Sequence, residues 1–469
     1  MKNALKQDLE NIGEILENVK NHSLDFLHQL HDLPTYATDQ QIVPAMLQTE
    51  GLGAEKCLEF FKETYQKLIV ASTGPRFWGF VTGGATPAAI AGDWLTATFD
   101  QNTQSTKGTG DVSAIIERET IRFLCQLFDL PEQFNGGFVT GATMSNFTGL
   151  AVGRQWAGSK LGIDISKSGM SSDIVVMSAT PHSSVIKSLS MLGFGSNNLL
   201  KIETLDSREA MDVADLEVKL IAQHGKPVIV SCSAGTVNTV DFDDIAAIVR
   251  LKEKYDFWLH IDAAFGGFAA CSPEHKHLLK GWEHADSITI DCHKWMNVPY
   301  DSAVILVKNE HARLQVETFQ NTNAPYLGDP SENFSYLNFL PENSRRFRAL
   351  PAWFSLIAYG KSGFQSVVEN SIARANELRA YIEQSESFEL AAPVRLNVVG
   401  FRLKDLKADL GAFLTSLNEG GKVFMTPTTL QGKACIRAAF VNFRTTSEDV
   451  KIAIQALEET VIANESPVS

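Results

Sequence analysis

The segments KPVIVSCSA (residues 226–234) and FWLHIDAA (residues 257–264) are short apolar runs of strand-forming residues. Further runs of this kind recur between about residues 71 and 310, and helical segments separate them: GGFVTG, DIVVMSAT, LLKIETL, SITIDCH and SAVILVK. Apolar strands that alternate with helices predict an α/β fold with a mainly parallel sheet and helices on both faces. In such a sheet we expect the functional site at the carboxyl ends of the strands.

The two ends of the chain differ from this central part. The first 70 residues read as helices, and GLGAEKCLEFFKETYQKLIV (residues 51–70) has the clearest amphipathic pattern. After residue 350 a long helix precedes three strand-like runs and a final helix. A chain of 469 residues exceeds the size at which one hydrophobic core keeps growing. We therefore predict a helical N-terminal arm over residues 1–72, a large domain over 73–348 and a small α/β domain over 349–469.

Charge and hydropathy argue against two classes of partner. The formal net charge is −14 and the pI is near 5.3, so the average surface would repel nucleic acid and anionic membranes. Because there is no run of about 18 apolar residues, we expect no membrane span. The N-terminal residues lack the unbroken apolar stretch of a signal peptide. The cysteines lie far apart without a CxxC pair, which predicts a cytoplasmic protein with reduced thiols and no disulfides: Cys57, Cys125, Cys232, Cys271, Cys292 and Cys435.

Two polar features follow predicted strands and begin predicted helices. In GGFVTGATMSNFTGLAVGR, the backbone N–H groups at Gly141, Ala142 and Thr143 and the Thr143 hydroxyl could cradle a phosphate. The alternative is an ordinary turn with a threonine cap. In VVMSATPHSSVIKSLSMLG, the imidazole of His182 could stack on a flat ring, or it could simply bond to the backbone at the helix start.

Two further features are a carboxylate and a lysine. Asp262 ends an apolar strand in FWLHIDAAFGGF, where a buried carboxylate needs a cationic or hydrogen-bonding partner and the small residues after it leave room for a flat group. His260 in the same strand reads as a packed core histidine. Lys294 follows another strand in SITIDCHKWMNVPYDSA, where a lysine either snorkels or supplies an amine for chemistry.

Together these four features match the requirements of pyridoxal 5′-phosphate. A carboxylate beside the pyridine nitrogen keeps it protonated, so the ring can accept the electrons released when a bond to the substrate Cα breaks. The lysine forms the Schiff base with the cofactor aldehyde.

The order and spacing of several motifs resemble the group II pyridoxal-phosphate-dependent amino acid decarboxylases, which include aromatic amino acid, glutamate, cysteine sulfinate and diaminobutyrate decarboxylases. The resemblance spans roughly residues 70 to 450 and rests on PRFWGF…TPAAIAGDWL, TGATMSNFTGLAVGR, PHSSVIKS, HIDAAFGG, ADSITIDCHKW, APYL, SRRFRALPAWFSLIAYGKSGF and RAAFVNFRTTSEDV. It implies the fold type I architecture of pyridoxal-phosphate-dependent transferases, with a mainly parallel seven-stranded sheet. It also implies a homodimer that converts an L-amino acid into the corresponding amine and carbon dioxide.

The same resemblance assigns roles to individual residues. Lys294 would be the Schiff-base lysine, Asp262 the partner of the pyridine nitrogen and His182 the ring-stacking imidazole, with Ala264 on the opposite ring face. Tyr326 in APYL would be the loop tyrosine that returns a proton to the substrate carbon, reaching the site across the dimer interface. The remaining matches are phosphate-binding positions and one threonine near the ring: Ala142, Thr143 and His293, and Thr236.

Some positions differ from the residues that are common in the motifs of this family. The phosphate turn reads TGAT, and Asp291-Cys292 stands where Asn-Pro is frequent. Because Asp291 would repel a phosphate, we expect its side chain to point elsewhere. Six aromatic residues could line a substrate pocket, but aromatic side chains more often belong to the core: Phe77, Trp78, Phe80, Trp94, Phe99 and Tyr326.

Other charged residues are expected to be structural. Arg345 and Arg346 could bind a carboxylate, although structural ion pairs are the more common role. The histidine pairs lack a convergent third ligand, so we predict no metal site: His28 and His31, and His275 and His277.

The sequence leaves several functions open. The same cofactor could serve an aldehyde synthase, an aldolase or lyase, or an aminotransferase, and more remotely the chain could be a non-catalytic binding module. The tyrosine at 326 favours simple decarboxylation. The FWGF segment gives a slight preference for an aromatic or medium-sized substrate, which the sequence does not identify further.

Overall fold

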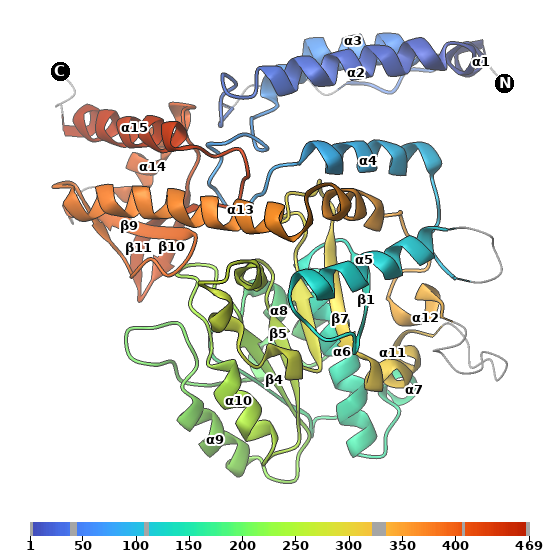
Figure 1. Cartoon of the computed structure of the whole chain (residues 1–469), viewed down its shortest axis with the longest axis vertical. Coiled ribbons are helices and arrows are strands. Elements are labelled where there is room, and N and C mark those ends of the chain that lie inside the picture. The colour runs from blue at the N-terminus through green and yellow to red at the C-terminus, as the bar shows by residue number, and fades with distance from the viewer. Residues whose placement is uncertain (1–2, 38–44, 107–111, 321–333, 406–408, 466–469) are drawn as a thin grey trace.

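The centre of the molecule is a seven-stranded sheet (Figure 1). The computed structural model describes residues 3–37, 45–106, 112–320, 334–405 and 409–465. The strand order is β1-β7-β6-β5-β4-β2-β3, from Phe134–Val139 (β1), Val175–Ser178 (β2), Leu199–Lys201 (β3), Val228–Ser233 (β4), Phe257–Asp262 (β5), Ser287–Ile290 (β6) and Ala303–Lys308 (β7). Strands β2 to β6 run parallel to one another, so the predicted mainly parallel seven-stranded sheet is confirmed.

Strand β7 is the exception, because it runs antiparallel to both β6 and β1. A parallel return from β6 would need a crossover, usually through a helix. Residues 291–302 between β6 and β7 contain no helix, so the chain turns back beside β6 instead. This turn carries Lys294 and lies at the edge where the parallel strands end.

Helices cover both faces of this sheet. One face packs against Ser113–Leu127 (α5), Val213–Ala222 (α9), Ile245–Lys252 (α10) and the first half of Ala349–Gln384 (α13). The other face packs against Ala142–Lys160 (α6), Ser183–Met191 (α8) and Ala312–Phe319 (α11), with Ile165–Ser168 (α7) and Tyr336–Phe339 (α12) nearby. Every residue of the central strands β4 and β5 is therefore buried.

A second, antiparallel sheet lies beside the C-terminal end of the chain. Its order is β10-β11-β9-β8, from Phe388–Leu390 (β8), Val398–Leu403 (β9), Thr426–Leu430 (β10) and Lys433–Ala439 (β11). Leu410–Glu419 (α14), Ser447–Glu465 (α15) and the second half of α13 cover it. Helix α13 thus contributes to both hydrophobic cores, and Gly360 interrupts its helical geometry between them with φ of 56°. The small α/β C-terminal unit of the predicted fold is confirmed, while the boundaries at residues 72/73 and 348/349 stay a prediction.

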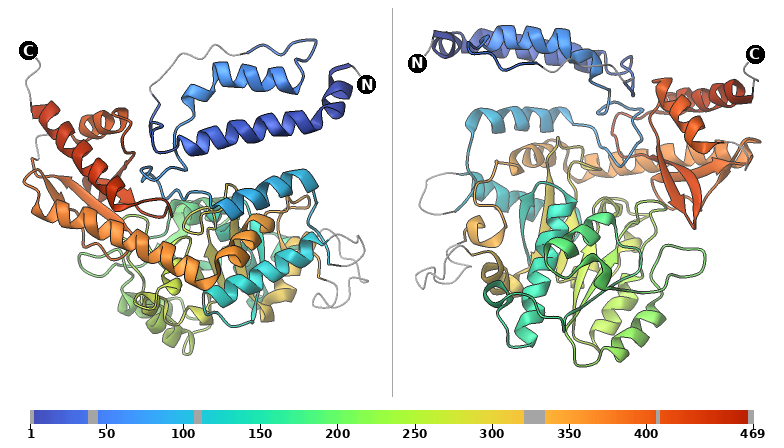
Figure 2. Two further views of the ribbon diagram at one scale, coloured as in Figure 1. Left: turned by 45° about the horizontal axis from the view of Figure 1, so that its top comes forward. Right: turned by 180° about the vertical axis from the view of Figure 1, so that it is seen from behind.

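The N-terminal helices stand apart from the two sheets. Figure 2 shows Asn3–Glu10 (α1), Ile12–His28 (α2) and Ala54–Thr64 (α3) as a layer beyond Pro87–Phe99 (α4). Helices α2 and α3 contain no buried residue, and several apolar side chains of the arm are largely exposed: Leu5 62%, Leu9 66%, Ile12 50%, Leu16 54%, Phe60 39% and Phe61 40%.

Two absences were expected from the sequence, a membrane-spanning segment and disulfide bonds. Across the described ranges, no helix has the length and apolarity needed to cross a bilayer. All six cysteines are free, and five of them are buried. Burial raises the pKa of the Cys125 thiol to about 12, which makes it unreactive at neutral pH.

Candidate active site

Lys294 lies in the turn after β6, at the carboxyl edge of the sheet. Its Nζ is 3.1 Å from Asp291 Oδ2 and 5.8 Å from the centre of the Phe265 ring, and 18% of the side chain is exposed. The backbone at Lys294 is in close contact with Gly83, where a Cβ atom would lie 1.9 Å from the Lys294 carbonyl oxygen. Only glycine at position 83 leaves this turn in place.

Asn297 anchors the lysine turn through hydrogen bonds of its side chain, and the sequence analysis did not identify it. The residue is fully buried with φ of 56°. Its Oδ1 accepts the N–H groups of Gly84 at 2.8 Å and Phe443 at 3.2 Å, and its Nδ2 donates to the carbonyls of Trp295 and Val441. One side chain therefore links the lysine turn to segments about 200 residues before it and 150 after it. An asparagine in a turn is common, so its sequence context carries no distinct signal.

Asp262 ends β5 and is 8% exposed. Its Oδ2 accepts a hydrogen bond from Asn146 Nδ2 at 2.9 Å, and its Oδ1 accepts from the Ala264 N–H at 3.2 Å. Both partners are uncharged, and none of the ion pairs between described residues includes Asp262. The carboxylate is therefore buried without a lysine or arginine to balance its charge.

Asn146, on α6, is a second residue that sequence analysis missed. Its Nδ2 also donates to Ser184 Oγ at 3.0 Å, while its Oδ1 accepts from Thr289 Oγ1 at 2.7 Å and lies 2.9 Å from His260 Nε2. His260 is fully buried, as predicted, and burial lowers its pKa to about 4. The neutral histidine and two hydroxyl groups thus fix the amide that holds Asp262.

His182 caps the start of α8. Its Nδ1 accepts from the Ser184 N–H at 3.2 Å and lies 2.8 Å from Ser184 Oγ, so the backbone-bonded arrangement exists. The His182 side chain is exposed, but protein atoms nearby still desolvate the ring and lower its pKa. The negative charge of Asp262 acts in the opposite direction and raises the pKa. The charges of Lys294 and Arg437 act in the same direction as desolvation. His182 therefore shares one electrostatic site with Asp262 and Lys294.

The start of α6 is open. Its N-cap residue, Gly141, has no side chain, and no side chain in the described part of the protein caps the helix, including that of Thr143. The first N–H groups of a helix have no intrahelical partner, and the helix dipole makes this end positive. His293 lies beside it, because a Cβ atom on Gly141 would be 3.4 Å from His293 Cε1. Ala142, Thr143 and His293 thus lie at the positive N-terminal end of a 19-residue helix, an arrangement that suits an anion.

Two further predicted residues, Ala264 and Thr236, already have hydrogen-bond partners within the protein. Ala264 is partly exposed directly after β5, and its carbonyl accepts from the Asp291 N–H at 2.8 Å. Thr236 is 4% exposed, and its hydroxyl donates to Glu209 Oε2 at 2.6 Å and accepts from the Asp241 N–H at 3.0 Å. Its hydroxyl is thus already engaged within the protein. Tyr326 lies outside the described residues.

Arg437 on β11 is a third residue that sequence analysis missed. It is 8% exposed, its Nη1 and Nη2 donate to the carbonyls of Val237 and Phe80, and its Nε is buried without a partner. Desolvation lowers its pKa, and its charge influences His182. The motif RAAFVNFRTTSEDV is part of the family resemblance and begins with Arg437, so this arginine could have been singled out.

One expectation about side chains was wrong, and another holds for only some of its residues. Asp291 does not point away, because it contacts Lys294 and has its Oδ1 3.1 Å from His293 Nε2; the charge of Lys294 makes its burial tolerable. Among the aromatic residues Phe77 and Trp78 are buried, but three others are exposed: Phe80 60%, Trp94 43% and Phe99 51%.

The expected structural role of the two arginines is confirmed. Arg345 Nη2 lies 2.6 Å from Glu117 Oε1, and both side chains are fully buried. Arg346 Nη1 lies 2.6 Å from Asp93 Oδ1.

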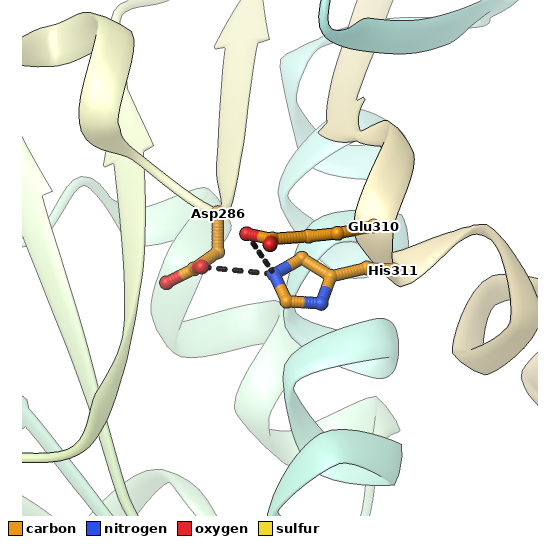
Figure 3. A group of neighbouring side chains, drawn as sticks. All are labelled: Asp286, Glu310 and His311. Atoms are coloured by element: carbon orange, nitrogen blue, oxygen red, sulfur yellow. Dashed lines mark hydrogen bonds and ion pairs between the residues drawn. The ribbon is translucent and has the colours of Figure 1, made fainter.

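One group of potential metal ligands exists among the described residues: Asp286, Glu310 and His311 (Figure 3). His311 Nε2 is 2.9 Å from Asp286 Oδ1, and Lys252 Nζ is 2.6 Å from Asp286 Oδ2. The charge of the buried carboxylate is already balanced, so these side chains form a closed ion-pair network.

A cavity of about 340 Å³ borders the lysine turn. Tyr300 lines it and stacks on the His293 ring at 4.2 Å between ring centres. Thr82 and Trp94 also line it, and its carboxylate, Asp93, is the one paired with Arg346.

Comparison with known proteins identifies the family. A model described as the pyridoxal-dependent decarboxylase conserved domain matches residues 34–404. The aromatic-L-amino-acid decarboxylase of Bacillus atrophaeus is 30% identical over 464 residues, which cover 93% of each chain. The L-2,4-diaminobutyrate decarboxylase of Rhizobium meliloti (strain 1021) is 28% identical over 384 residues, covering 79% of this chain and 75% of the relative.

A solved structure agrees in fold. The Oryza sativa TDC with PLP and tryptamine superimposes with a TM-score of 0.88 at 21% identity, covering 97% of this chain and 99% of that one. The chain therefore belongs to the pyridoxal-dependent decarboxylase family and is an amino acid decarboxylase with pyridoxal 5′-phosphate as its cofactor.

Proposed function

We propose that the cofactor binds where β5, β6 and α6 meet. Lys294 would be the residue that forms the Schiff base with the cofactor aldehyde. The observation that supports this most directly is Asp262, a buried carboxylate with no cationic partner, which together with Lys294 acts on the charge of His182. A protonated pyridine nitrogen would supply the missing charge. His182, at the start of α8, would stack on the cofactor ring, and Ala264 would lie on the opposite face.

The cofactor phosphate would bind at the open start of α6. The free N–H groups at Ala142 and Thr143 and the neighbouring His293 are the donors available there. Thr236 stays a predicted neighbour of the ring.

The substrate carboxylate would pair with Arg437. This guanidinium is buried near His182 and retains an unused Nε donor, and arginine suits a carboxylate because two N–H groups can bind it together. When bound, the cofactor accepts the electrons released as the bond between Cα and the carboxylate breaks. Tyr326 would then return a proton to Cα, which gives the amine.

The substrate side chain would point toward the cavity beside Tyr300. Aromatic and uncharged polar side chains line it, and its one acidic group, Asp93, is paired. We propose an aromatic or medium-sized apolar L-amino acid as the substrate. An acidic or basic side chain would find no unpaired partner among the described lining residues.

The test combines a substrate panel with a lysine variant. The cofactor-loaded protein is incubated with the twenty standard amino acids, diaminobutyrate, cysteine sulfinate and dihydroxyphenylalanine, and carbon dioxide, amine and aldehyde are measured together. We expect equal amounts of carbon dioxide and amine from one aromatic or apolar substrate. Lys294→Ala should lose both the activity and the visible absorbance of the lysine-bound cofactor, while the control Lys308→Ala keeps both.

Other product patterns would select the alternatives. Aldehyde in place of amine would indicate an aldehyde synthase, and a spectral change without carbon dioxide would indicate an aminotransferase, aldolase or lyase. A visible band that survives Lys294→Ala would contradict the assignment of the lysine.

We propose further that the chain works as a homodimer with the active site at the subunit interface. Several apolar side chains of α1, α2 and α3 are exposed, and exposed apolar surface is typical of protein–protein interfaces. A second copy would cover it. We place the protein in the cytoplasm, because its six cysteines are free.

Two substitutions test the dimer. Leu9→Glu combined with Leu16→Glu puts charges on the exposed face of α1 and α2, and light scattering after size exclusion should show dissociation. Glu14→Gln and Glu17→Gln on the same arm serve as the control. A wild-type protein that is monomeric at micromolar concentration would contradict the proposal.

A further inference from the structure

Asp291 is the acidic residue that forms an ion pair with Lys294. It follows β6 directly, is 2% exposed, and its N–H donates to the Ala264 carbonyl at 2.8 Å. Its position is therefore fixed between the ends of β5 and β6.

The two carboxylate oxygens face different side chains. Oδ2 lies 3.1 Å from Lys294 Nζ, and Oδ1 lies 3.1 Å from His293 Nε2. His293 Nδ1 accepts the Ser302 N–H at 3.2 Å, whereas Asp291 Oδ1 is near Nε2 but is buried without a hydrogen-bond partner among the described residues. Burial alone would raise the pKa of Asp291, but Lys294 and His293 more than offset this effect and the pKa is lowered. The carboxylate is ionised at neutral pH.

Asp291 is also the one anion within ion-pair distance of Lys294 among the described residues. The other groups near the amine are the Phe265 ring and, at longer range, His182 and Tyr300. None of these is negatively charged at neutral pH.

A lysine that joins the cofactor has to leave it when the substrate amine takes its place, and it has to return afterwards. A free lysine side chain has about 2 kcal/mol of rotamer entropy, so an unheld amine would spend much of its time away from the site. We propose that Asp291 is a positioning residue that holds the Lys294 amine at the carboxyl edge of the sheet whenever the amine is not joined to the cofactor. This inference rests on the proposed role of Lys294. The amide that the family often has at this position would hold an ammonium group less strongly.

Chemical labelling of the cofactor-free full-length protein tests the proposal without measuring activity. A small amine reagent such as acetic anhydride is applied at one pH, and the labelling rate of each lysine is measured by peptide mass spectrometry. Asp291→Asn should raise the labelling rate of Lys294 about tenfold, the usual effect of losing a charge-assisted hydrogen bond. A change of less than twofold would overturn the proposal.

Asp286→Asn is a matched control from the same strand region (Figure 3). Asp286 is equally buried and lies 2.6 Å from Lys252 Nζ, whose side chain is 24% exposed. This variant should raise the labelling of Lys252 and leave Lys294 unchanged. If Asp291→Asn raises the labelling of Lys252 as well, the variant has unfolded.

If the variant unfolds, a comparison of two lysines within the wild-type protein still tests the proposal. The side chains of Lys294 and Lys308 are similarly exposed, at 18% and 15%, but the nearest carboxylate to Lys308 is the exposed Glu310 at 3.9 Å. Lys294 should label several times more slowly than Lys308, and equal rates would contradict the proposal.

A double-mutant cycle on cofactor affinity distinguishes an effect of Asp291 through Lys294 from an effect through His293. If Asp291 acts through the lysine, Asp291→Asn should change affinity in the wild-type background and have less than half of that effect in the Lys294→Ala background. An equal effect in both backgrounds would assign Asp291 to His293 and the phosphate instead. A wild-type protein that gives no visible band with the cofactor would contradict the proposed function, whatever the labelling shows.

Discussion

Removal of the Glu117 carboxylate should destabilise the protein more than any surface substitution. Glu117 and Arg345 form an ion pair with no exposed atoms on either side chain. Glu117 Oε1 also accepts the N–H of Phe138, while Arg345 Nη2 donates to the Phe138 carbonyl at 2.7 Å. The pair thus provides hydrogen-bond partners for the Phe138 N–H and carbonyl on the outer edge of β1. This strand leads into the turn at Gly141.

Glu117→Ala leaves a guanidinium and a backbone N–H buried without their partner. Breaking a buried pair from one side costs about 3–5 kcal/mol, and the unpaired N–H is part of that cost. The measurement is urea-induced unfolding at a fixed protein concentration, followed by tryptophan fluorescence. Because β1 precedes the proposed phosphate site, the variant should also retain less cofactor after dialysis.

Two comparisons decide whether the reasoning holds. The double variant Glu117→Leu with Arg345→Met should lose less stability than Glu117→Ala, since it leaves no buried charge. The exposed pair Arg313 and Glu317 at 2.9 Å is the control, where Glu317→Ala should cost less than about 0.5 kcal/mol. A loss below about 1 kcal/mol for Glu117→Ala would refute the argument from the buried charge.

Three further predictions concern the site and its surroundings. Asn146→Ala removes the donor to Asp262 and should weaken cofactor binding about tenfold in an absorbance titration. Gly83→Ala places a Cβ atom against the Lys294 carbonyl and should cost about 1–3 kcal/mol and lower the cofactor content of the purified protein. Burial raises the pKa of Asp243 to about 6, above its unfolded value, so this group favours folding at low pH and the contribution is lost as the pH rises through 6. The stability difference between wild type and Asp243→Asn should therefore change by about 2 kcal/mol between about pH 4.5 and about pH 7.5, to the disadvantage of the wild type at the higher pH.

Each of these three predictions has a control of the same chemistry. The exposed Asn309→Ala should leave cofactor binding unchanged, and Gly13→Ala, where no atom lies within 4 Å of the new Cβ, should not lower stability. Asp244→Asn, beside Asp243 but exposed, should show no comparable pH dependence. Equal effects of a variant and its control would contradict the prediction concerned.

The sequence predicted the sheet well because strand and helix patterns are local. Strands β4 and β5 are buried on both faces and therefore appear as continuous apolar runs. The direction of β7 was not predicted, because its apolar run looks like that of a parallel strand. Direction depends on the connection from β6, which proved to contain no helix.

Within the site, residues with a distinct local pattern were found and residues with distant partners were not. Lys294, Asp262 and His182 each follow a strand end, so the topology alone brings them to one edge. Asn146, Asn297 and Arg437 were missed. Their partners lie up to 357 positions away along the chain, and no local pattern records such contacts.

The sequence by itself determined the parallel architecture and the cofactor chemistry, because periodicity, strand ends and residue type are local features of the chain; the lysine that would join the cofactor stays a prediction. Only the tertiary structure decided where charges meet. Asp291 was expected to avoid the site from its sign alone, yet it lies 3.1 Å from both Lys294 and His293. A buried carboxylate takes the position in which its charge is balanced, and the balancing groups become known only when the chain is folded.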